Sequence, residues 1–407
     1  MDFDDTLEEA AFRAECRSWL DDNASLRTSG SAEVWRTLRP RTTDDDEAAM
    51  AMAKKWQICK AAAGYAGIRW PVRFGGRALS AHLAAVFKTE EARYDVPANS
   101  FQVGVDMVGP TLIAHGTEVQ QLQHLDAIRR GEQVWCQLFS EPGAGSDLAG
   151  LSTSAVRDGD EFVVNGQKVW TSGAHSSDWG ILLVRTDLDA PKHRGISYLL
   201  VDMTTPGIDV RPIRQIDGAV HFNEVFFTDV RVPVANVVGE VNGGWAVTMT
   251  TLVAERSAIG GGGMVQIGEI INLARVMGVT EDPVIRQELA RIYSYFEITR
   301  FLGYRVQTAL SHGTEPGPES SVMKLHISRQ YARSSDLFEQ MLGAAGMLWR
   351  DDAPLDGFFQ DLFLAQWAPR IGGGTDQVQR NIVGERVLGL PAEPRLDKTA
   401  PFRSLPK

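Results

Sequence analysis

The sequence predicts a multidomain α+β protein in which a small β domain lies between two helical domains. The chain has 407 residues, of which 43% are hydrophobic, so it holds enough apolar material for several cores. The hydrophobic period is helical to about Gly131, two-residue from about Trp135 to Glu240, and helical again from Gly243 to about Leu388. We therefore divide the chain into an N-terminal α-helical domain (1–131), a central β domain (132–241), a C-terminal α-helical bundle (242–390) and a C-terminal arm (391–407).

The N-terminal domain shows two helix signals. Leu7, Ala11 and Ala14 fall on one helical stripe, and the helix is expected to end near the polar run 21–23. Thr117 and Gln120 have the spacing of a capping box, in which each side chain satisfies a free N–H at the start of a helix. The sequence therefore predicts one helix from about residue 7 and another that starts after Thr117.

Turn dipeptides and short apolar runs define the central domain. Asp158-Gly159 and Asn165-Gly166 are typical of tight turns, and residues 161–164 between them predict a short strand. Further strands are expected at 181–184, 196–201 and 225–227. Several short antiparallel strands at this spacing predict a small barrel or a sandwich.

The sequence again predicts helices in the C-terminal part of the chain. Pro283 suits the first turn of a long helix, and residues 313–320 predict a loop between helices. Beyond Leu390 the chain is rich in proline and is expected to form a surface arm, with a partner subunit as one surface for it. The glycine runs 260–263 and 372–374 do not fit a G-x-G-x-x-G dinucleotide motif, and they suggest that something large packs against the backbone.

Charge and composition exclude several function classes. The net charge of −11 argues against a nucleic-acid partner, and no apolar run reaches the roughly 20 residues of a membrane span. Cys16, Cys59 and Cys136 have no paired spacing, so neither a disulfide framework nor a zinc site is expected. The histidines form no ligand motif, and we expect no metal. The acidic start does not resemble a targeting peptide, and a cytoplasmic location is expected.

Two segments combine residues that suit a cofactor. Residues 135–147 lead from an apolar strand into a Pro/Gly loop, whose backbone N–H groups suit an anion or a polar ring edge. Residues 167–173 place an aromatic face beside small hydroxyl groups. Taken by loop composition alone, ordinary β-hairpin ends would be the favoured interpretation of both segments.

Five segments follow one another along the chain: FSEPGAGSD (139–147), NGQKVWTS (165–172), FNEVFFTDVRVP (222–233), QMLG (340–343) and GTDQVQR (374–380). Together they resemble the acyl-CoA dehydrogenase family, and the resemblance covers nearly the whole chain. It implies a helical domain, a small β-barrel domain and a C-terminal four-helix bundle. It also implies non-covalent FAD, oxidation of an acyl-CoA thioester to trans-2-enoyl-CoA with the β-hydride passing to flavin N5, and an electron-transferring flavoprotein as acceptor.

The resemblance also implies which residues bind the flavin. Gln340 and Gly343 match contacts that a neighbouring subunit makes, so a tetramer is expected, either homomeric or heteromeric. Ala344 stands where the family usually has a second glycine, which would hold the backbone further from the cofactor. The residues expected to line the flavin or its phosphates in the same subunit are Gln137, Leu138, Ser140, Gly145, Ser146, Trp170 and Ser172; Arg286, Thr375 and Gln377 complete the expected dinucleotide contacts.

The catalytic base departs from the commonest family pattern. The usual glutamate before Gly-Thr is replaced by Gly373, whose backbone N–H is still available to the thioester oxygen. A second branch, with the long-chain and isovaleryl-CoA dehydrogenases, carries the base on a helix just before an arginine, and Glu255 and Arg256 match it. The resemblance implies that Glu255 removes the α-proton and that Arg256 supports the site. A free glutamate has a pKa of about 4.3, so the reaction requires an environment that strengthens this base.

Other functions remain open at this stage. The loss of the C-terminal glutamate is compatible with a flavin-binding but catalytically incomplete subunit of a heteromeric enzyme. The same fold would also suit an oxidase or a nitroalkane-oxidising relative, and a helical interaction scaffold is an alternative outside enzymology. The acyl chain length, its branching, and steroid-like substrates are left undetermined.

Overall fold

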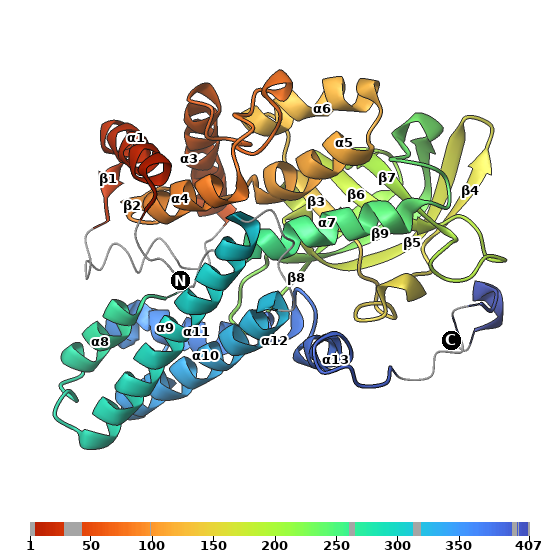
Figure 1. Cartoon of the computed structure of the whole chain (residues 1–407). Helices are drawn as coiled ribbons and strands as arrows, with labels where there is room; N and C mark the ends of the chain where they lie inside the picture. Colours follow the sequence, from red (N-terminus) through yellow and green to blue (C-terminus); the bar gives the residue numbers. More distant parts are fainter. Residues whose placement is uncertain are drawn as a thin grey trace. The chain divides into compact units, whose positions relative to one another are not determined.

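The computed structural model describes residues 5–27, 43–97, 99–259, 265–311, 319–392, 397 and 399–405 (Figure 1). The chain divides into two compact units, each built from separate stretches of sequence. We call them the helical unit, drawn from 1–42, 79–96 and 259–392, and the sheet unit, drawn from 43–78, 97–258 and 393–407. The predicted succession of helical, β and helical segments is confirmed.

The sheet unit contains one seven-stranded sheet with helices before and after it in sequence. Its helices are α3 (Thr43–Ala62), α5 (Gly109–His115), α6 (Glu118–Arg130) and α7 (Gly244–Ile259), the last of which ends at the unit boundary. Its strands are β3 (Trp135–Leu138), β4 (Ser154–Asp158), β5 (Glu161–Ser172), β6 (Trp179–Arg185), β7 (Ile196–Asp202), β8 (Ile208–Ile213) and β9 (Phe222–Pro233).

The sheet is mixed, which corrects the prediction of an antiparallel one. The strands follow the order β3-β6-β4-β5-β9-β8, and β7 also pairs with β6. Strand β6 runs parallel to both β3 and β4, whereas the other pairs are antiparallel. Parallel neighbours require a crossover connection, which short-range turn signals do not reveal.

Both faces of the central strands are buried. On β6, Ile181 and Leu183 belong to the core shared with α5, α6 and α7, while Leu182 and Val184 belong to the core shared with β9. Because successive side chains of a strand point to opposite faces, this continuous apolar run marks a strand covered on both sides. The sheet is therefore a rigid base for the loops that leave its edges.

The helical unit is built around a set of long helices (Figure 1). Helix α10 packs against α9, α11 and α13, and the buried side chains include Phe338 and Phe359. Its elements are α1 (Leu7–Asn23), β1 (Ser25–Leu26), α4 (Ala81–Glu91), β2 (Tyr94–Asp95), α8 (Ile267–Val276), α9 (Pro283–Ser311), α10 (Glu319–Leu342), α11 (Phe358–Ala365), α12 (Ala368–Ile371) and α13 (Asp376–Arg386).

Several local predictions are confirmed and others are wrong. Helix α9 starts at Pro283, and Thr117 and Gln120 form the predicted capping box of α6. Helix α1 has the predicted bounds, but its buried stripe is Phe12, Cys16 and Leu20 rather than the one that begins at Leu7, which is exposed. Glycines 260–263 and residues 313–318 of the predicted loop lie outside the described residues, and residues 319–320 begin α10.

The two turn dipeptides have different outcomes. Asp158-Gly159 connects β4 to β5, and Gly159 has a φ of +62°. Asn165-Gly166 lies inside β5, where the register with β9 shifts between Val164 and Gly166. That glycine has a φ of +153° and faces Thr153 closely, so it serves a bulge rather than a turn.

Neither a membrane span nor a metal cluster is found in the part of the chain that the structure describes. No described helix is both long enough and apolar enough to cross a bilayer. No group of three or more His, Cys, Asp or Glu side chains among the described residues is arranged to hold a metal ion.

Candidate functional site

Helix α7, which carries Glu255, is fixed in the sheet unit by buried hydroxyl groups. Thr251 shares hydrogen bonds with Thr111 on α5 (2.9 Å) and with Tyr198 on β7 (3.1 Å), and all three side chains are buried. His115 Nε2 lies 2.8 Å from the hydroxyl of Thr250. Because buried polar groups are costly unless they are paired, these bonds favour one position of α7 against the sheet.

The start of α7 depends on a glycine. A Cβ on Gly244 would lie 2.6 Å from the carbonyl carbon of Ser197 and from the backbone nitrogen of Tyr198. Only a residue without a side chain allows the helix to approach β7 so closely. The helix is therefore held at its first turn by backbone packing and further along by hydroxyl groups.

Glu255 lies four residues after Thr251 on this fixed helix. Its side chain is half-buried, and Gln137 Nε2 on β3 donates a hydrogen bond to Glu255 Oε2 at 3.3 Å. An amide donor stabilises and orients a carboxylate. The backbone of Arg256 continues α7, while its side chain lies outside the described residues.

A buried ion pair holds the start of the loop that is predicted to bind the flavin, residues 139–147, which we call the flavin loop. Lys168 Nζ on β5 lies 2.8 Å from Glu141 Oε1 and also donates to the carbonyl of Phe139 at 3.1 Å. The Glu141 carboxylate further accepts hydrogen bonds from the backbone N–H groups of Ser152 (2.7 Å) and Thr153 (2.9 Å). These contacts tie the start of the loop to β5 and to the residues directly before β4.

Burial and pairing act in opposite directions on this pair. Burial alone would raise the pKa of Glu141, but the charge of Lys168 and the hydrogen bonds outweigh it, so that the pKa is lowered. Burial lowers the pKa of the Lys168 ammonium, although Glu141 opposes the shift. The carboxylate therefore remains ionised and serves as an anchor.

Beyond this anchor the loop presents free backbone donors. Gly145 and Ser146 are exposed, and a Cβ added to Gly143 or Gly145 would meet no atom within 4 Å. Among the described residues, the N–H groups of these three residues find no acceptor. Several unpaired N–H groups beside open space fit an anionic diphosphate such as that of FAD.

Residues on β3 lie directly before this loop. Gln137 is half-buried and its amide is directed to Glu255, whereas the Leu138 side chain is fully buried in the core between the strands. Only the main chain of Leu138 is therefore available to a cofactor. The carbonyl of Ser140 accepts a hydrogen bond from the Val169 N–H at 2.9 Å, which joins the loop to β5.

A β-bulge turns Trp170 outward. The pairing of β5 with β9 shifts between Lys168 and Thr171, and Trp170 has a φ of +61°, a conformation that is uncommon for a bulky residue. Trp170 is 59% exposed, and its ring meets the Phe222 ring edge-on at 6.0 Å. Ser172, also exposed, pairs with Phe222. An exposed aromatic face beside a hydroxyl group suits a planar ring system.

In the helical unit, two predicted contacts lie where α10 ends. Gln340 is exposed in the last turn of α10, and Gly343 follows the helix with a φ of +54°. A Cβ on Gly343 would meet no atom within 4 Å. The glycine is thus required by the backbone conformation rather than by local crowding.

A further segment that is predicted to contact the cofactor leads into the start of α13. Thr375 caps this helix by accepting the N–H of Val378 at 3.2 Å, and Gln377 is exposed in the first turn. Gly373 and Gly374 have φ values of +63° and +88°, and the buried Gln379 donates to the carbonyl of Gly373 at 3.2 Å. A glutamate at 373 would be strained in this backbone conformation.

The Arg286 side chain donates a hydrogen bond to a residue outside the predicted cofactor segments. Its guanidinium is exposed near the start of α9 and donates to the carbonyl of Thr280 at 3.2 Å.

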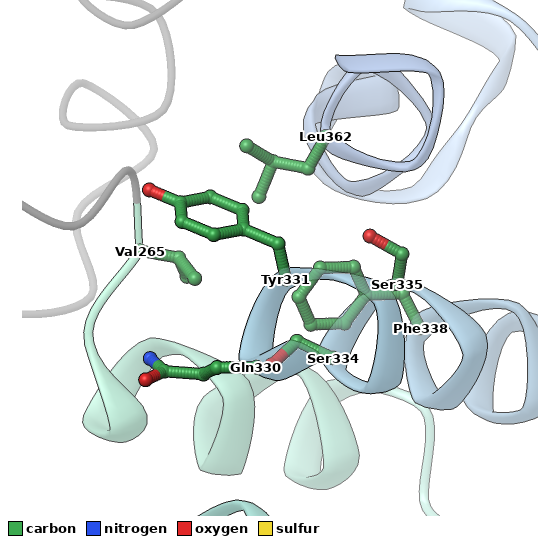
Figure 2. A pocket seen from close by; sticks show the side chains of 7 residues that line it. All are labelled: Val265, Gln330, Tyr331, Ser334, Ser335, Phe338 and Leu362. Atoms are coloured by element: carbon green, nitrogen blue, oxygen red, sulfur yellow. The ribbon is translucent and has the colours of Figure 1, made fainter. Parts of the chain in front are cut away.

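The helical unit also has a small cavity of about 10 Å³, the size of one water molecule, beside the unpartnered hydroxyl of Ser334. It is too small for an acyl chain. Figure 2 shows its lining residues: Val265, Gln330, Tyr331, Ser334, Ser335, Phe338 and Leu362.

Sequence reasoning missed the side chains that support the site. The motif residues were identified, but the Lys168–Glu141 ion pair, the Gln137–Glu255 hydrogen bond and the hydroxyl cluster around Thr251 were not. For the ion pair, the available signal was an ionisable residue, Lys168, directly before the apolar Val169 and Trp170. The partners of these supporting side chains lie far away in sequence, so their pairing is visible only in the fold.

Comparison with known proteins assigns all three parts of the chain. Residues 7–132 match the family model described as acyl-CoA dehydrogenase, N-terminal domain. Residues 136–230 match the middle domain of acyl-CoA dehydrogenases, and residues 242–388 match their C-terminal domain.

Individual relatives agree with this assignment. The chain is 39% identical over 386 residues to "Acyl-CoA dehydrogenase IpdE1" of Mycobacterium tuberculosis, which covers 94% of this chain and 98% of the relative. A structure described as "Tcur3481-Tcur3483 steroid ACAD" is 32% identical, has a TM-score of 0.80, and covers 97% of this chain and 100% of its own. The ChsE4-ChsE5 complex from Mycobacterium tuberculosis is 30% identical, with a TM-score of 0.77 and coverage of 96% and 100%.

Proposed function

The chain belongs to the acyl-CoA dehydrogenase family, and from that premise we propose that Glu255 is the base that removes the α-proton of a bulky acyl-CoA thioester. As a member of this family the protein is an FAD-dependent oxidoreductase that acts on acyl-CoA. The proposed product is the trans-2-enoyl-CoA. The observation that carries the proposal is the fixed position of Glu255 and the amide donor that reaches it.

Four features of the sheet unit support this role for Glu255. The carboxylate is half-buried, and it lies on a helix that is anchored by Thr251. It accepts a hydrogen bond from Gln137, and β3, the strand that carries Gln137, leads into the loop proposed for the flavin. A base must be held close to one orientation to act on a carbon acid. The alternative position, 373, holds glycine and lacks any side chain.

The residues present fit the family cofactor. Bound FAD supplies the hydride acceptor for the β-carbon. The N–H groups of Gly143, Gly145 and Ser146 are proposed to receive the diphosphate, and Trp170 and Ser172 to flank the flavin ring. Gln340, Gly343, Thr375, Gln377 and Arg286 remain proposed dinucleotide contacts, and the backbone N–H of Gly373 remains the proposed donor to the thioester oxygen.

We propose a polycyclic, steroid-type acyl-CoA as the substrate class. The support is the similarity to a structure described as a steroid ACAD, at 32% identity and with nearly full coverage of both chains. An electron-transferring flavoprotein remains the proposed acceptor, and a cytoplasmic location and a role in β-oxidation of such acyl groups remain proposals as well.

An anaerobic absorbance titration tests the activity. The purified FAD-loaded protein is titrated with short, branched, long-chain and polycyclic acyl-CoAs. We expect a polycyclic thioester to bleach the flavin band of the wild type and to leave Glu255→Gln oxidised, since an amide does not accept the proton. Glu118→Gln, an exposed carboxylate change on α6, is the matched control and should behave as the wild type.

The same titration separates the alternatives. Bleaching that survives Glu255→Gln would overturn the assignment of the base. An FAD-loaded protein that no thioester bleaches would favour the incomplete-subunit alternative, for which the similarity to the ChsE4-ChsE5 complex gives a specific motive. Rapid reoxidation of the bleached protein by air would favour an oxidase.

A further inference from the structure

The C-terminal segment, defined here as residues 399–405, forms an extra layer on the sheet unit. The N–H of Phe402 donates to the carbonyl of Ala190 at 3.0 Å, and the N–H of Arg403 donates to that of Leu188 at 3.1 Å. Pro401 also forms a bridge with Pro191. The segment therefore pairs with the connection between β6 and β7 through backbone hydrogen bonds.

Phe402 covers a buried cation. The guanidinium of Arg185 lies 3.8 Å from the centre of the Phe402 ring, and Arg185 is only 2% exposed. Burial lowers the pKa of Arg185 to about 10, so the group is still charged at neutral pH. A buried charge needs partners, and an aromatic face is one of them.

The other partners of Arg185 join two loops. Its Nη2 donates to the carbonyl of Ala149 at 2.6 Å and to that of Leu151 at 3.2 Å, directly after the flavin loop. Its Nη1 donates to the carbonyl of Lys192 at 2.6 Å. One guanidinium thus ties the end of the flavin loop to the connection that the C-terminal segment pairs with.

Lys192 makes a second link to the same loop. Its ammonium lies 2.9 Å from both carboxylate oxygens of Asp147, the last residue of the flavin loop, and it also pairs with Asp397. Its side chain is largely buried, unlike that of Asp147, which is exposed. Lys192 therefore fixes the position of Asp147 and neutralises a negative charge next to an expected diphosphate.

Links at the loop ends matter because, between Glu141 and Asp147, only Ala144 packs into the core of the sheet unit. Added Cβ atoms at Gly143 and Gly145 would meet nothing within 4 Å, so no neighbouring side chain restrains them. Glu141 and Lys168 hold the first end of the loop, whereas Lys192 and Arg185 hold the second. A loop ordered before binding loses less entropy when its ligand arrives.

We propose that the C-terminal segment keeps the flavin loop in its FAD-binding conformation, with Arg185 and Lys192 as positioning residues. Phe402 completes the burial of Arg185, and Arg185 in turn holds the carbonyls of Ala149 and Leu151. The proposal rests on the proposed role of residues 143–146 in binding the FAD diphosphate.

The experiment measures FAD affinity of the apoprotein in the absence of acyl-CoA. Phe402→Ala removes the ring and is expected to weaken FAD binding about tenfold, with faster hydrogen exchange at residues 143–151. Phe402→Leu keeps the apolar cover and should recover part of the affinity. Arg403 lies on the same segment as Phe402, and its side chain forms an exposed ion pair with Asp189. Arg403→Ala breaks this pair and should bind FAD within about twofold of the wild type.

Two results would overturn the proposal. One is unchanged FAD affinity and exchange in Phe402→Ala. The other is a loss of affinity that is not specific to the Phe402 ring. It would be seen either as an equal loss in Arg403→Ala or as a loss of apoprotein stability large enough to account for the weaker binding, because either would mark a general structural role. Lys192→Met gives a second, independent measurement, since it loosens the loop end without altering Phe402, and it should also weaken FAD binding.

The outcome is separable from that of the proposed reaction. FAD affinity does not depend on Glu255 or on any thioester. If acyl-CoA bleaches the wild type but Phe402→Ala binds FAD normally, the proposed function is supported and this inference is overturned. If Phe402→Ala binds FAD weakly but no thioester bleaches the wild type, this inference is supported and the proposed function is contradicted.

Discussion

At the scale of single residues, the hydrogen bond from Gln137 to Glu255 makes a prediction about turnover. Gln137→Leu removes the 3.3 Å donor that helps to orient the carboxylate, so kcat is expected to fall about tenfold while KM changes little. Steady-state kinetics with the best substrate of the titration provide the measurement. FAD affinity is measured alongside, since Gln137 was also expected to line the flavin.

A matched glutamine provides the control. Gln167 donates to Glu224 at 3.0 Å in the same unit, so Gln167→Leu breaks the same kind of bond away from Glu255. Its kcat should stay near the wild-type value. If Gln137→Leu lowers FAD affinity and leaves kcat intact in the loaded enzyme, Gln137 is a cofactor contact and not a positioning residue for the base.

The buried pair of Lys168 and Glu141 makes a prediction about stability. Lys168→Met leaves a carboxylate buried beside an apolar side chain, and breaking a buried pair in this way costs about 3–5 kcal/mol. Denaturant unfolding should show this loss. The double variant Lys168→Met/Glu141→Gln should recover part of it, because the uncompensated charge is gone. A single variant as stable as the wild type would contradict the prediction.

Sequence reasoning works unevenly at this scale. The residues of the FSEPGAGSD and QKVWTS segments could be named because their order along the chain is characteristic. Their supports could not. Lys192 contacts Asp147 at the end of the flavin loop from 45 positions away, and Arg185 contacts Ala149 directly after the loop from 36 positions away. No spacing rule connects residues so distant.

At the scale of elements, a buried carboxylate joins α1 to α4. Glu90 on α4 is 2% exposed and receives hydrogen bonds from Arg13 (2.7 Å) and Arg17 (2.8 Å) on α1, and from Arg93 (2.7 Å). Burial alone would raise the pKa of Glu90, but the three arginines outweigh it and lower the pKa from 4.5 to about 2. The contact between the two helices therefore depends on an ionised group.

The sign of the pH dependence follows from this lowered pKa. The folded protein holds Glu90 ionised, so its stabilising contribution is complete above about pH 4.5 and is lost as the pH falls towards 2. Glu90→Gln should be less stable at neutral pH and should lose less on acidification over that range. Denaturation midpoints measured from neutral pH down to about pH 2 test this. Glu132→Gln, an exposed carboxylate change, should follow the wild type.

The elements themselves were largely predictable, and the errors have physical causes. The capping box at Thr117 and the proline at 283 are local signals, and both predicted helix starts are correct. Asn165-Gly166 carries the local signal of a turn, yet pairing with β9 keeps it inside a strand. Here non-local hydrogen bonds outweigh the preference of a dipeptide.

At the scale of the whole molecule, the expected role of Gln340 in a neighbouring subunit makes a prediction about assembly. Gln340→Ala should lose FAD, and Glu255→Gln should lose turnover. A mixed oligomer of the two variants contains sites with an intact Glu255 and an intact Gln340 from different chains. If the sites are shared, mixed dimers should recover about half of the wild-type activity per pair.

Co-expression of the two variants with different affinity tags provides the measurement. The doubly purified oligomer is assayed beside each variant alone and beside the untreated wild type. Absence of recovery in a mixed oligomer that contains FAD would show that each chain completes its own site. An inactive wild type that becomes active with a second kind of chain would instead indicate a heteromer.

The place of the C-terminal segment in the chain has a consequence for biosynthesis. Residues 259–392 of the helical unit are translated between the strands of the sheet unit and Phe402, which covers Arg185. During translation the guanidinium of Arg185 therefore has no aromatic cover until the helical unit has been made. The sheet unit cannot reach its final packing cotranslationally in sequence order, and its last step follows the synthesis of the other unit. A ribosome that stops after Ala392 has made the whole helical unit, but it leaves the guanidinium of Arg185 uncovered and the ammonium of Lys192 without Asp397.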